Sequence, residues 1–195
     1  AQAAGVSCEG FDYFDNGGEQ ARLALAADFA ARFGDVLSEK AAARKAKDPV
    51  CCAMLLLKLG AVDCVAAGRV YTTGDVIIAA QSIVGVKEGV STISSVGILN
   101  VPGYEGPEGP MLVIADCAIN ASPDASELAD IAISSADTAK MLIGWEPRVA
   151  MLSFSTCGSS EHESIDVIRE AISQARDRRP ELKIDGEFQL DAALI

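Results

Sequence analysis

The chain has 195 residues, half of them hydrophobic, and a formal net charge of −12. The length and apolar content are enough for one substantial domain or parts of two. The acidity, with no stripe of Lys and Arg, excludes a nucleic-acid-binding surface, and no apolar run reaches the roughly 18 residues that cross a bilayer. We therefore expect a soluble, cytoplasmic protein that binds neither nucleic acid nor membrane.

The six cysteines predict free thiols and not disulfides. Cys51 and Cys52 are adjacent, and Cys64 and Cys117 lie within apolar runs, so we expect thiols that are buried in a reducing compartment. The single histidine, His162, has no metal-ligand spacing around it, and we expect no metal site.

The two ends of the chain predict an internal segment of a longer protein. The sequence starts at Ala1 without a methionine, and it closes at Ile195 inside an apolar, helix-like stretch that has no stop signal.

The first half of the chain is predicted to be mainly helical. Apolar residues recur at helical spacing from Glu19 to Gly34, and a charged helix covers about 38–47. A third helix has Asp48 as N-cap and Pro49 at its first position, and it ends at Gly60. The apolar run 61–67 predicts a strand, and a further helix follows over about 73–84.

The second half alternates between strands and helices. Strands are predicted within 90–101 and over 111–117, 148–154 and 182–184, and helices over 123–143, with Ser122 as a cap, and 163–178. Such alternation favours an α/β fold with three α/β/α layers and a mostly parallel sheet. We place a domain boundary near Gly89, which leaves a partial first domain at 1–88 and most of a second at 89–195.

Small polar residues follow three predicted strands, in the stretches 115–120, 153–160 and 185–193. Strand ends and helix starts in open α/β sheets bind anions, because unpaired backbone N–H groups point outward there. The stretch 153–160 offers five hydroxyl side chains, backbone N–H groups and a helix dipole to a phosphoryl or carboxyl group. An equally good interpretation is a capping loop in which Ser159 or Ser160 satisfies the start of the next helix.

A comparable site is predicted at 69–75, where Thr hydroxyls can donate to phosphate oxygens and Arg69 can pair with them in bidentate fashion. Here too an N-cap, Thr73, is the equal alternative. Asp116 and Asn120 close the predicted strand 111–117, and Asn120 is explained equally well as a turn residue. Asp185 and Asp191 are candidate acids or ligands, and Asp185 beside a glycine also suits a turn.

Together these stretches resemble the phosphate acetyltransferase family. The similarity extends over about 48–195 and rests on Asp48-Pro49-Val50, on the run from Gly68 to Asp75, on the three polar stretches, and on the helical segments 127–133 and 178–182. It implies two α/β domains, the second inserted in the first, in a homodimer. It also implies acyl transfer between phosphate and coenzyme A, with coenzyme A as a substrate and no further cofactor or metal.

The resemblance also implies roles for individual residues. The substrate-binding residues would be Arg69, Thr72, Thr73, Asp75, Ser155, Thr156 and Ser159. The family's catalytic base and its Ser-Arg pair belong to a segment beyond Ile195, so the catalytic residues are not assigned and we expect the 195 residues alone to be inactive.

Two positions depart from the family pattern. Ile78 replaces an arginine found in many members, and Cys157 replaces a lysine, so each change removes a cation that could contact an anion. Our hypothesis is that Arg69 compensates for Ile78. These departures leave two alternative functions open. The first is a non-catalytic domain that senses acetyl-CoA, like the one fused to malic enzymes. The second, less favoured, is a plain assembly module.

Overall fold

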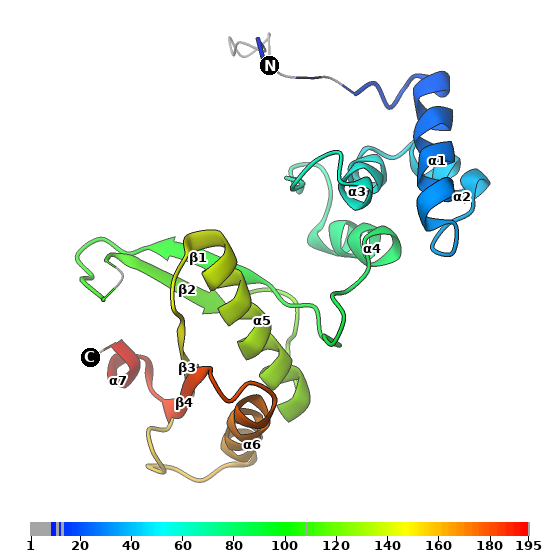
Figure 1. Ribbon diagram of the computed structural model, residues 1–195. Helices are drawn as coiled ribbons and strands as arrows, with labels where there is room; N and C mark the ends of the chain where they lie inside the picture. Colours follow the sequence, from blue (N-terminus) through cyan, green and yellow to red (C-terminus); the bar gives the residue numbers. More distant parts are fainter. Residues whose placement is uncertain (1–8, 11, 13, 108, 195) are drawn as a thin grey trace. The chain divides into compact units, whose positions relative to one another are not determined.

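The computed structural model describes residues 9, 10, 12, 14–107 and 109–194. The chain divides into two compact units, here called unit 1 (residues 1–86) and unit 2 (residues 87–195). Each unit has its own arrangement of helices and strands (Figure 1). Within the described ranges, no helix is both long and apolar enough to span a membrane.

Unit 1 is helical throughout its regular structure. Its helices are α1 (Glu19–Phe33), α2 (Glu39–Lys45), α3 (Pro49–Leu59) and α4 (Thr73–Ile83). All four were predicted, with ends that agree to within one or two residues. Contacts of α1 with α2 and α3, and of α3 with α4, enclose a core that includes Leu25, Phe29, Leu55 and Ile83.

The predicted boundaries of α3 are confirmed by its capping groups. The carboxylate of Asp48 accepts a hydrogen bond of 2.9 Å from the N–H of Cys51, and Pro49 occupies the first turn, where a missing N–H costs nothing. Gly60 ends the helix with φ of +74°, a left-handed conformation that glycine adopts without steric penalty.

The strand predicted over 61–67 is wrong. These residues have no regular secondary structure, and all but Val65 are exposed. A strand is stable only when its backbone groups pair with a neighbour. Among the described residues of unit 1 no strand exists to pair with this run, so its apolar character alone does not make it a strand.

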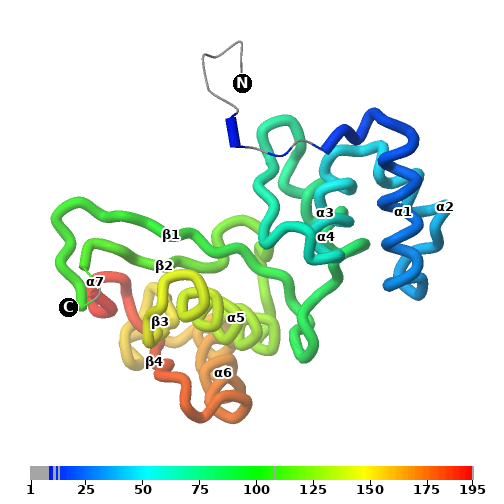
Figure 2. The backbone as a smooth tube through the Cα atoms, turned by 45° about the horizontal axis from the view of Figure 1, so that its top comes forward, coloured from blue at the N-terminus to red at the C-terminus, as the bar shows by residue number. Residues whose placement is uncertain are grey.

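Unit 2 combines strands and helices (Figure 2). Its strands are β1 (Val96–Asn100), β2 (Met111–Ala115), β3 (Arg148–Leu152) and β4 (Lys183–Phe188), and its helices are α5 (Ala125–Ile143), α6 (Glu163–Arg178) and α7 (Leu190–Leu194). The predicted α/β class is confirmed, and the bounds of α6 agree with the prediction at both ends.

The strands of the described residues form two separate pairs in place of the single, mostly parallel sheet that was predicted. β1 and β2 are antiparallel, with Val96 opposite Ala115, because the short loop 101–110 joins them as a hairpin. β3 and β4 are parallel, with Val149 opposite Ile184, because α6 carries the chain back between them.

The start of α5 differs slightly from the prediction. Asp124, and not Ser122, is the N-cap: its carboxylate accepts from the N–H of Glu127, and the carboxylate of Glu127 accepts from the N–H of Asp124, both at 2.9 Å. This capping box satisfies two backbone donors at once, which a cap at Ser122 would not do. Small residues such as Ala129, Ala132 and Ala171 then let α5 and α6 pack closely.

The cysteines of the described residues are free thiols, as predicted, but most are not buried. Cys52 is buried and Cys51 half-buried, whereas Cys64, Cys117 and Cys157 are exposed. Cys64 and Cys117 lie on irregular segments and not in the strands in which burial was expected.

Candidate functional site

The loop 153–160, between β3 and α6, closes around the carboxylate of Glu187 from β4. Glu187 is 2% exposed. Its Oε1 accepts hydrogen bonds from the hydroxyl of Ser155 at 3.0 Å and from the N–H of Gly158 at 2.8 Å. One buried acceptor therefore fixes two points of the loop.

Arg169 of α6 neutralises this buried carboxylate. Its Nε lies 3.0 Å from Oε2 of Glu187, and its Nη2 lies 3.0 Å from Oε1. The bidentate guanidinium, followed by the N–H of Gly158, lowers the pKa of Glu187 to about 2. The group is therefore an anion at neutral pH, and it accepts hydrogen bonds but donates none.

The backbone N–H groups of the loop are already occupied. All six backbone N–H groups from residue 155 to residue 160 donate hydrogen bonds within the protein. Their acceptors, in chain order, are Ser153 Oγ, Ser159 Oγ, Glu187 O, Glu187 Oε1, Thr156 O and Ser155 Oγ. In this conformation the loop therefore does not present the nest of free N–H groups that its sequence suggested.

Three predicted site residues belong to this loop, and they differ in access to solvent. The Ser155 side chain is fully buried, and its hydroxyl lies 3.3 Å from that of Ser159. Thr156 is half-buried and accepts from the N–H of Gln189 at 2.9 Å. Ser159 is exposed. A ligand approaching from solvent would meet Ser159 and Thr156, while Ser155 holds the loop together.

The cap of α6 is His162, so the predicted cap at Ser159 or Ser160 is wrong. Its Nδ1 accepts from the N–H of Ser164 at 3.2 Å. Ser159 instead accepts from the N–H of Thr156 at 3.0 Å, which turns the loop before the helix begins. The helix start thus lies beyond both serines in the chain.

Asn120 lies in a turn, as one of its two interpretations predicted, and the carboxylate of Asp116 fixes this turn. The Asp116 carboxylate accepts from the hydroxyl and the N–H of Ser95 and from the N–H of Asn120, the last at 2.8 Å. The amide of Asn120 donates to the carbonyl of Ile93 at 2.8 Å. Burial opposes ionisation of Asp116, but these hydrogen bonds outweigh it and hold its pKa well below the ordinary value.

The predicted site of unit 1 surrounds the start of α4. Thr72, and not Thr73, caps the helix: its hydroxyl lies 2.7 Å from Oδ2 of Asp75, and that carboxylate also accepts the N–H of Thr72. Thr72 and Asp75 therefore satisfy each other. Arg69 and Thr73 are exposed, and no hydrogen bond or ion pair of their side chains is found among the described residues.

The two other candidate acids have local roles. The Asp185 carboxylate accepts from Nη2 of Arg176 and from the N–H of Gly186, each at 2.9 Å. Asp185 lies within β4, opposite Ala150, so the turn that its sequence context suggested is wrong. Asp191 lies exposed in the first turn of α7, where a negative charge suits the helix dipole. Across the described ranges no three His, Cys, Asp or Glu side chains are grouped as a metal site requires.

The structure thus brings Ser155, Thr156 and Ser159 into one hydrogen-bonded loop of unit 2. Arg69, Thr72, Thr73 and Asp75 belong to unit 1.

Sequence reasoning missed the central pair, Glu187 and Arg169. Glu187 belongs to the polar stretch 185–193, but nothing in the order of residues links it to Ser155, which lies 32 positions earlier. Arg169 has the appearance of an ordinary residue on the solvent face of a helix.

Comparisons with known proteins show the family of the chain. A family model described as phosphate acetyl/butaryl transferase matches residues 1–195. The chain belongs to this family. A phosphate acetyltransferase of Thermoanaerobacterium thermosaccharolyticum is 46% identical over 149 residues, which are 76% of this chain and 45% of that protein. A phosphate acetyltransferase of Clostridium acetobutylicum is 44% identical over 148 residues, 76% of this chain and 44% of that protein.

Solved structures of the family resemble the chain throughout. The EutD phosphotransacetylase from Staphylococcus aureus matches with a TM-score of 0.81 and 30% identity, over 98% of this chain and 57% of the other. The chain therefore spans about half the length of the relatives that it matches. The α/β fold inferred from the resemblance is consistent with these structures.

Proposed function

We propose that the full-length protein transfers an acetyl or other short acyl group between phosphate and coenzyme A, converting acetyl phosphate and coenzyme A to acetyl-CoA and phosphate or the reverse. The match of the family model to all 195 residues carries this proposal. The two relatives compared above are phosphate acetyltransferases, which favours an enzyme over the acetyl-CoA-sensing alternative. Coenzyme A acts as a substrate in this reaction, and no further cofactor is proposed.

The chemistry requires a base that takes the thiol proton, because the thiolate attacks the acyl carbonyl. It also requires donors that stabilise the developing oxyanion and the departing phosphate. Glu187 is bound by Arg169, with a pKa of about 2, so it does not suit the role of base at neutral pH. As the family resemblance implies, we assign the base to the part of the full-length protein outside these residues.

We propose two kinds of role for the predicted substrate-binding residues. In unit 1, the exposed Arg69 and Thr73 would contact a substrate anion, while the mutual hydrogen bonds of Thr72 and Asp75 would hold the loop in place.

In unit 2, Ser159 and Thr156 would offer hydroxyls, and Ser155 would act as a positioning residue through Glu187. The burial of Ser155 and the exposure of Ser159 support this division.

The first test measures thioester formation from coenzyme A and a panel of acyl phosphates, with this chain and with the full-length protein. We expect turnover by the full-length protein alone. Turnover by the 195 residues would contradict the placement of the base. No turnover by either, with acetyl-CoA still bound by the full-length protein, would favour the sensor.

A second test addresses Arg69. We expect Arg69→Ala in the full-length protein to raise the phosphate KM by about tenfold, because a charge-assisted hydrogen bond is lost. Arg44→Ala changes another exposed arginine of unit 1 and should leave KM unchanged. If Arg69→Ala leaves the phosphate KM unchanged, Arg69 does not compensate for the arginine that Ile78 replaces.

We further propose that the full-length protein is a cytoplasmic homodimer in which residues 1–88 belong to a first domain and 89–195 to a second, inserted one. The division of contacts between Val86 and Lys87 supports this boundary. Light scattering during size-exclusion chromatography of the full-length protein tests the dimer.

A further inference from the structure

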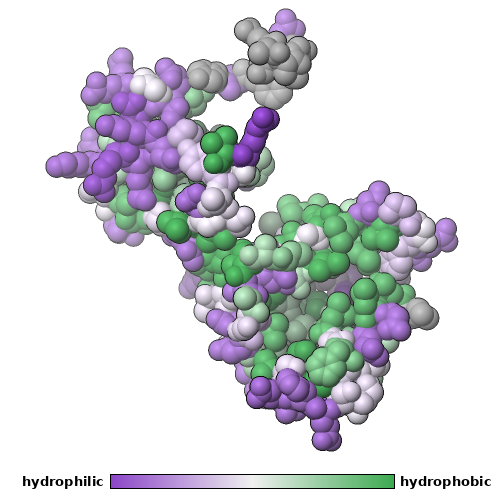
Figure 3. Space-filling view, turned by 180° about the vertical axis from the view of Figure 1, so that it is seen from behind, coloured by the Kyte–Doolittle hydropathy of each residue, from purple (hydrophilic) through white to green (hydrophobic). Residues whose placement is uncertain are grey.

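A small pocket of unit 1, between α1 and α2, is lined mainly by cations. Its volume is about 260 Å³. Of the seven described residues that line it, four are cations, namely Arg22, Lys40, Arg44 and Lys47, and one is a carboxylate, Glu19. Hydrophilic side chains cover much of this end of unit 1 (purple, upper left in Figure 3). In a chain whose net charge is −12, such a local excess of positive charge indicates a site for an anion.

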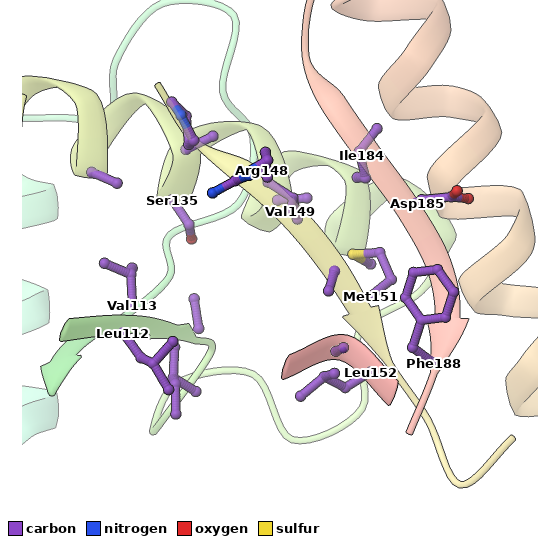
Figure 4. Close-up of a pocket in the computed structure, with 18 of the residues that line it drawn as sticks. Leu112, Val113, Ser135, Arg148, Val149, Met151, Leu152, Ile184, Asp185 and Phe188 are labelled. Carbon is purple, nitrogen blue, oxygen red and sulfur yellow. The ribbon is translucent and has the colours of Figure 1, made fainter. Parts of the chain in front are cut away.

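The groove between the two strand pairs of unit 2 has a different chemistry (Figure 4). Its volume is about 1170 Å³, and Leu112, Val149 and Leu152 are among the mainly apolar side chains that line it. Transfer of a charged group from water to apolar surroundings is costly. A multiply charged ligand therefore suits the pocket of unit 1 and not this groove.

Three of the four cations have no partner of their own. Among the residues that the structure describes, the side chains of Lys40, Arg44 and Lys47 form no hydrogen bond or ion pair, and all three are exposed. Like charges four positions apart on a helix, such as those of Lys40 and Arg44, repel each other. Lys40 also lies in the first turn of α2, where the helix dipole disfavours a cation. The arrangement costs unit 1 stability, and a bound anion would relieve the repulsion.

The fourth cation, Arg22, is held in place by the loop that precedes α1. Its Nη1 donates to the carbonyl of Asn16, at 2.8 Å, and to that of Gly17. The side-chain amide of Asn16 donates in turn to the carbonyl of Lys47 at 3.2 Å. This loop therefore connects the α1 wall of the pocket to the end of α2. Nε and Nη2 of Arg22 form no hydrogen bond within the described ranges, so the fixed guanidinium can still donate to an anion.

The ligand that fits the pocket is a compact anion with several linked phosphates. The volume is close to the lower end of the roughly 300–1,000 Å³ of ordinary ligand pockets, which suits a small molecule and not a polymer. Lys40 and Lys47 are separated by two helical turns, about 10 Å along the axis, a span that linked phosphates bridge better than a single phosphate. Arginine binds phosphate oxygens in bidentate fashion and lysine binds them as a point charge, and the pocket offers both.

We propose that this pocket binds linked phosphates, as in inorganic tripolyphosphate or the tail of a nucleoside triphosphate. Its lining residues do not overlap with the predicted substrate-binding residues of unit 1, so the proposal does not depend on the proposed acyl transfer. For the same reason Arg44→Ala remains a suitable control for the phosphate KM. The order of residues did not reveal the pocket, because Arg22 and Lys40 belong to different helices and meet only where α1 contacts α2.

The first test measures the reactivity of individual lysines in the full-length protein. N-hydroxysuccinimidyl acetate acetylates accessible amino groups, and mass spectrometry gives the rate at each lysine. We expect tripolyphosphate at ten times its Kd to slow the labelling of Lys40 and Lys47 about tenfold, because about one pocket in ten is then free. Lys45 of the same helix donates to Ser82 and does not line the pocket, so its labelling should not change.

Two ligands distinguish the possible sources of the phosphates. Adenosine triphosphate should protect the same lysines at a concentration similar to that of tripolyphosphate if the pocket binds the phosphates alone. It should protect them at a concentration more than about tenfold lower if the pocket also binds the nucleoside. Adenosine, and sodium chloride at matched ionic strength, should protect neither Lys40 nor Lys47, since neither supplies linked phosphates and salt acts only by screening.

Lys47→Ala is the disrupting variant, and Lys45→Ala is its matched control. With Lys40 as the readout, Lys47→Ala should raise the Kd of tripolyphosphate about tenfold, because one charge-assisted hydrogen bond is lost. Lys45→Ala removes the same charge from α2 outside the pocket and should leave the Kd unchanged. If circular dichroism shows that Lys47→Ala is unfolded, Arg44→Ala repeats the test with the same readout.

Three results would overturn the proposal. The first is equal labelling of Lys40 and Lys47 with and without either phosphate ligand. The second is equally strong protection of Lys45, which would indicate general screening. The third is an equal rise in Kd for Lys47→Ala and Lys45→Ala, which would indicate long-range attraction without a defined pocket.

Discussion

The guanidinium of Arg169 holds both carboxylate oxygens of Glu187, at 3.0 Å each, in the interior of unit 2. The same carboxylate accepts from Ser155 and Gly158, so one ion pair ties α6, β4 and the loop 153–160 together. Removal of the carboxylate charge would leave the loop with weaker acceptors and Arg169 without its partner.

This ion pair predicts a specific loss of stability in acid. The pKa of Glu187 falls from an ordinary 4.5 to about 2, chiefly because Arg169 stabilises the anion. A group whose pKa is lowered by folding stabilises the protein fully above its unfolded pKa, and this stabilisation is lost as the pH falls from about 4.5 through about 2. Urea unfolding followed by the fluorescence of Trp145, the single tryptophan, measures this in unit 2.

Glu187→Gln should be less stable than the natural chain at pH 6, and the difference should shrink as the pH approaches 3. Asp185→Asn, two residues away on β4, breaks an exposed ion pair with Arg176 and should cost less than about 1 kcal/mol. A Glu187→Gln deficit that is independent of pH would contradict the account.

The cap of α4 makes a second prediction. Thr72→Ala removes the hydroxyl that accepts from the N–H of Asp75, and it should cost unit 1 about 1 kcal/mol of unfolding free energy. Thr73→Ala, in the first turn, should change stability by less than about 0.5 kcal/mol. Amide exchange of α4 is the measurement, and Thr72→Ser should restore slow exchange. Equal effects of Thr72→Ala and Thr73→Ala would show that the cap is misassigned.

Asp130, buried in α5, anchors the segment that precedes β1. Its carboxylate accepts from the N–H and hydroxyl of Ser91, at 3.0 and 2.6 Å, and from Nη1 of Arg178 at 2.8 Å. Asp130→Ala should cost about 2 kcal/mol, because it removes the acceptor of three hydrogen bonds, one of them from the partly exposed guanidinium of Arg178. The free energy of unfolding comes from Trp145 fluorescence, and Asp177→Ala on exposed α6 surface is the control. A loss below about 1 kcal/mol would contradict the anchoring role.

Ile78 predicts a gain of function, on the basis of the proposed reaction. Its side chain is 64% exposed on α4, so an arginine fits there without entering the core. In the full-length protein, Ile78→Arg should lower the phosphate KM by about tenfold, because it adds a charge-assisted hydrogen bond. Val36→Arg adds the same charge at another exposed position of unit 1 and should not change KM. An equal effect of both variants would indicate long-range attraction only.

The sequence predicted those elements whose signals are local. Asp48 and Pro49 start α3 and Gly60 ends it, because capping groups act within one turn of the helix. The bounds of α6 were predicted at both ends, since apolar spacing and a following proline act over the same short range. By contrast, the apolar run 61–67 satisfied the local signal for a strand, but the pairing partner that a strand needs is a separate segment.

The sequence alone therefore determined the α/β class, the helices, the family and the residue types of the candidate loops, because spacing and capping are encoded within a few neighbouring residues. Only the tertiary structure decided that Ser155 is buried against Glu187, that Arg169 neutralises this carboxylate, and that the strands form two pairs with an open groove between them. Those features depend on burial and on contacts between residues far apart in the chain, and no local pattern specifies which distant partner a buried hydroxyl or an open strand edge will meet.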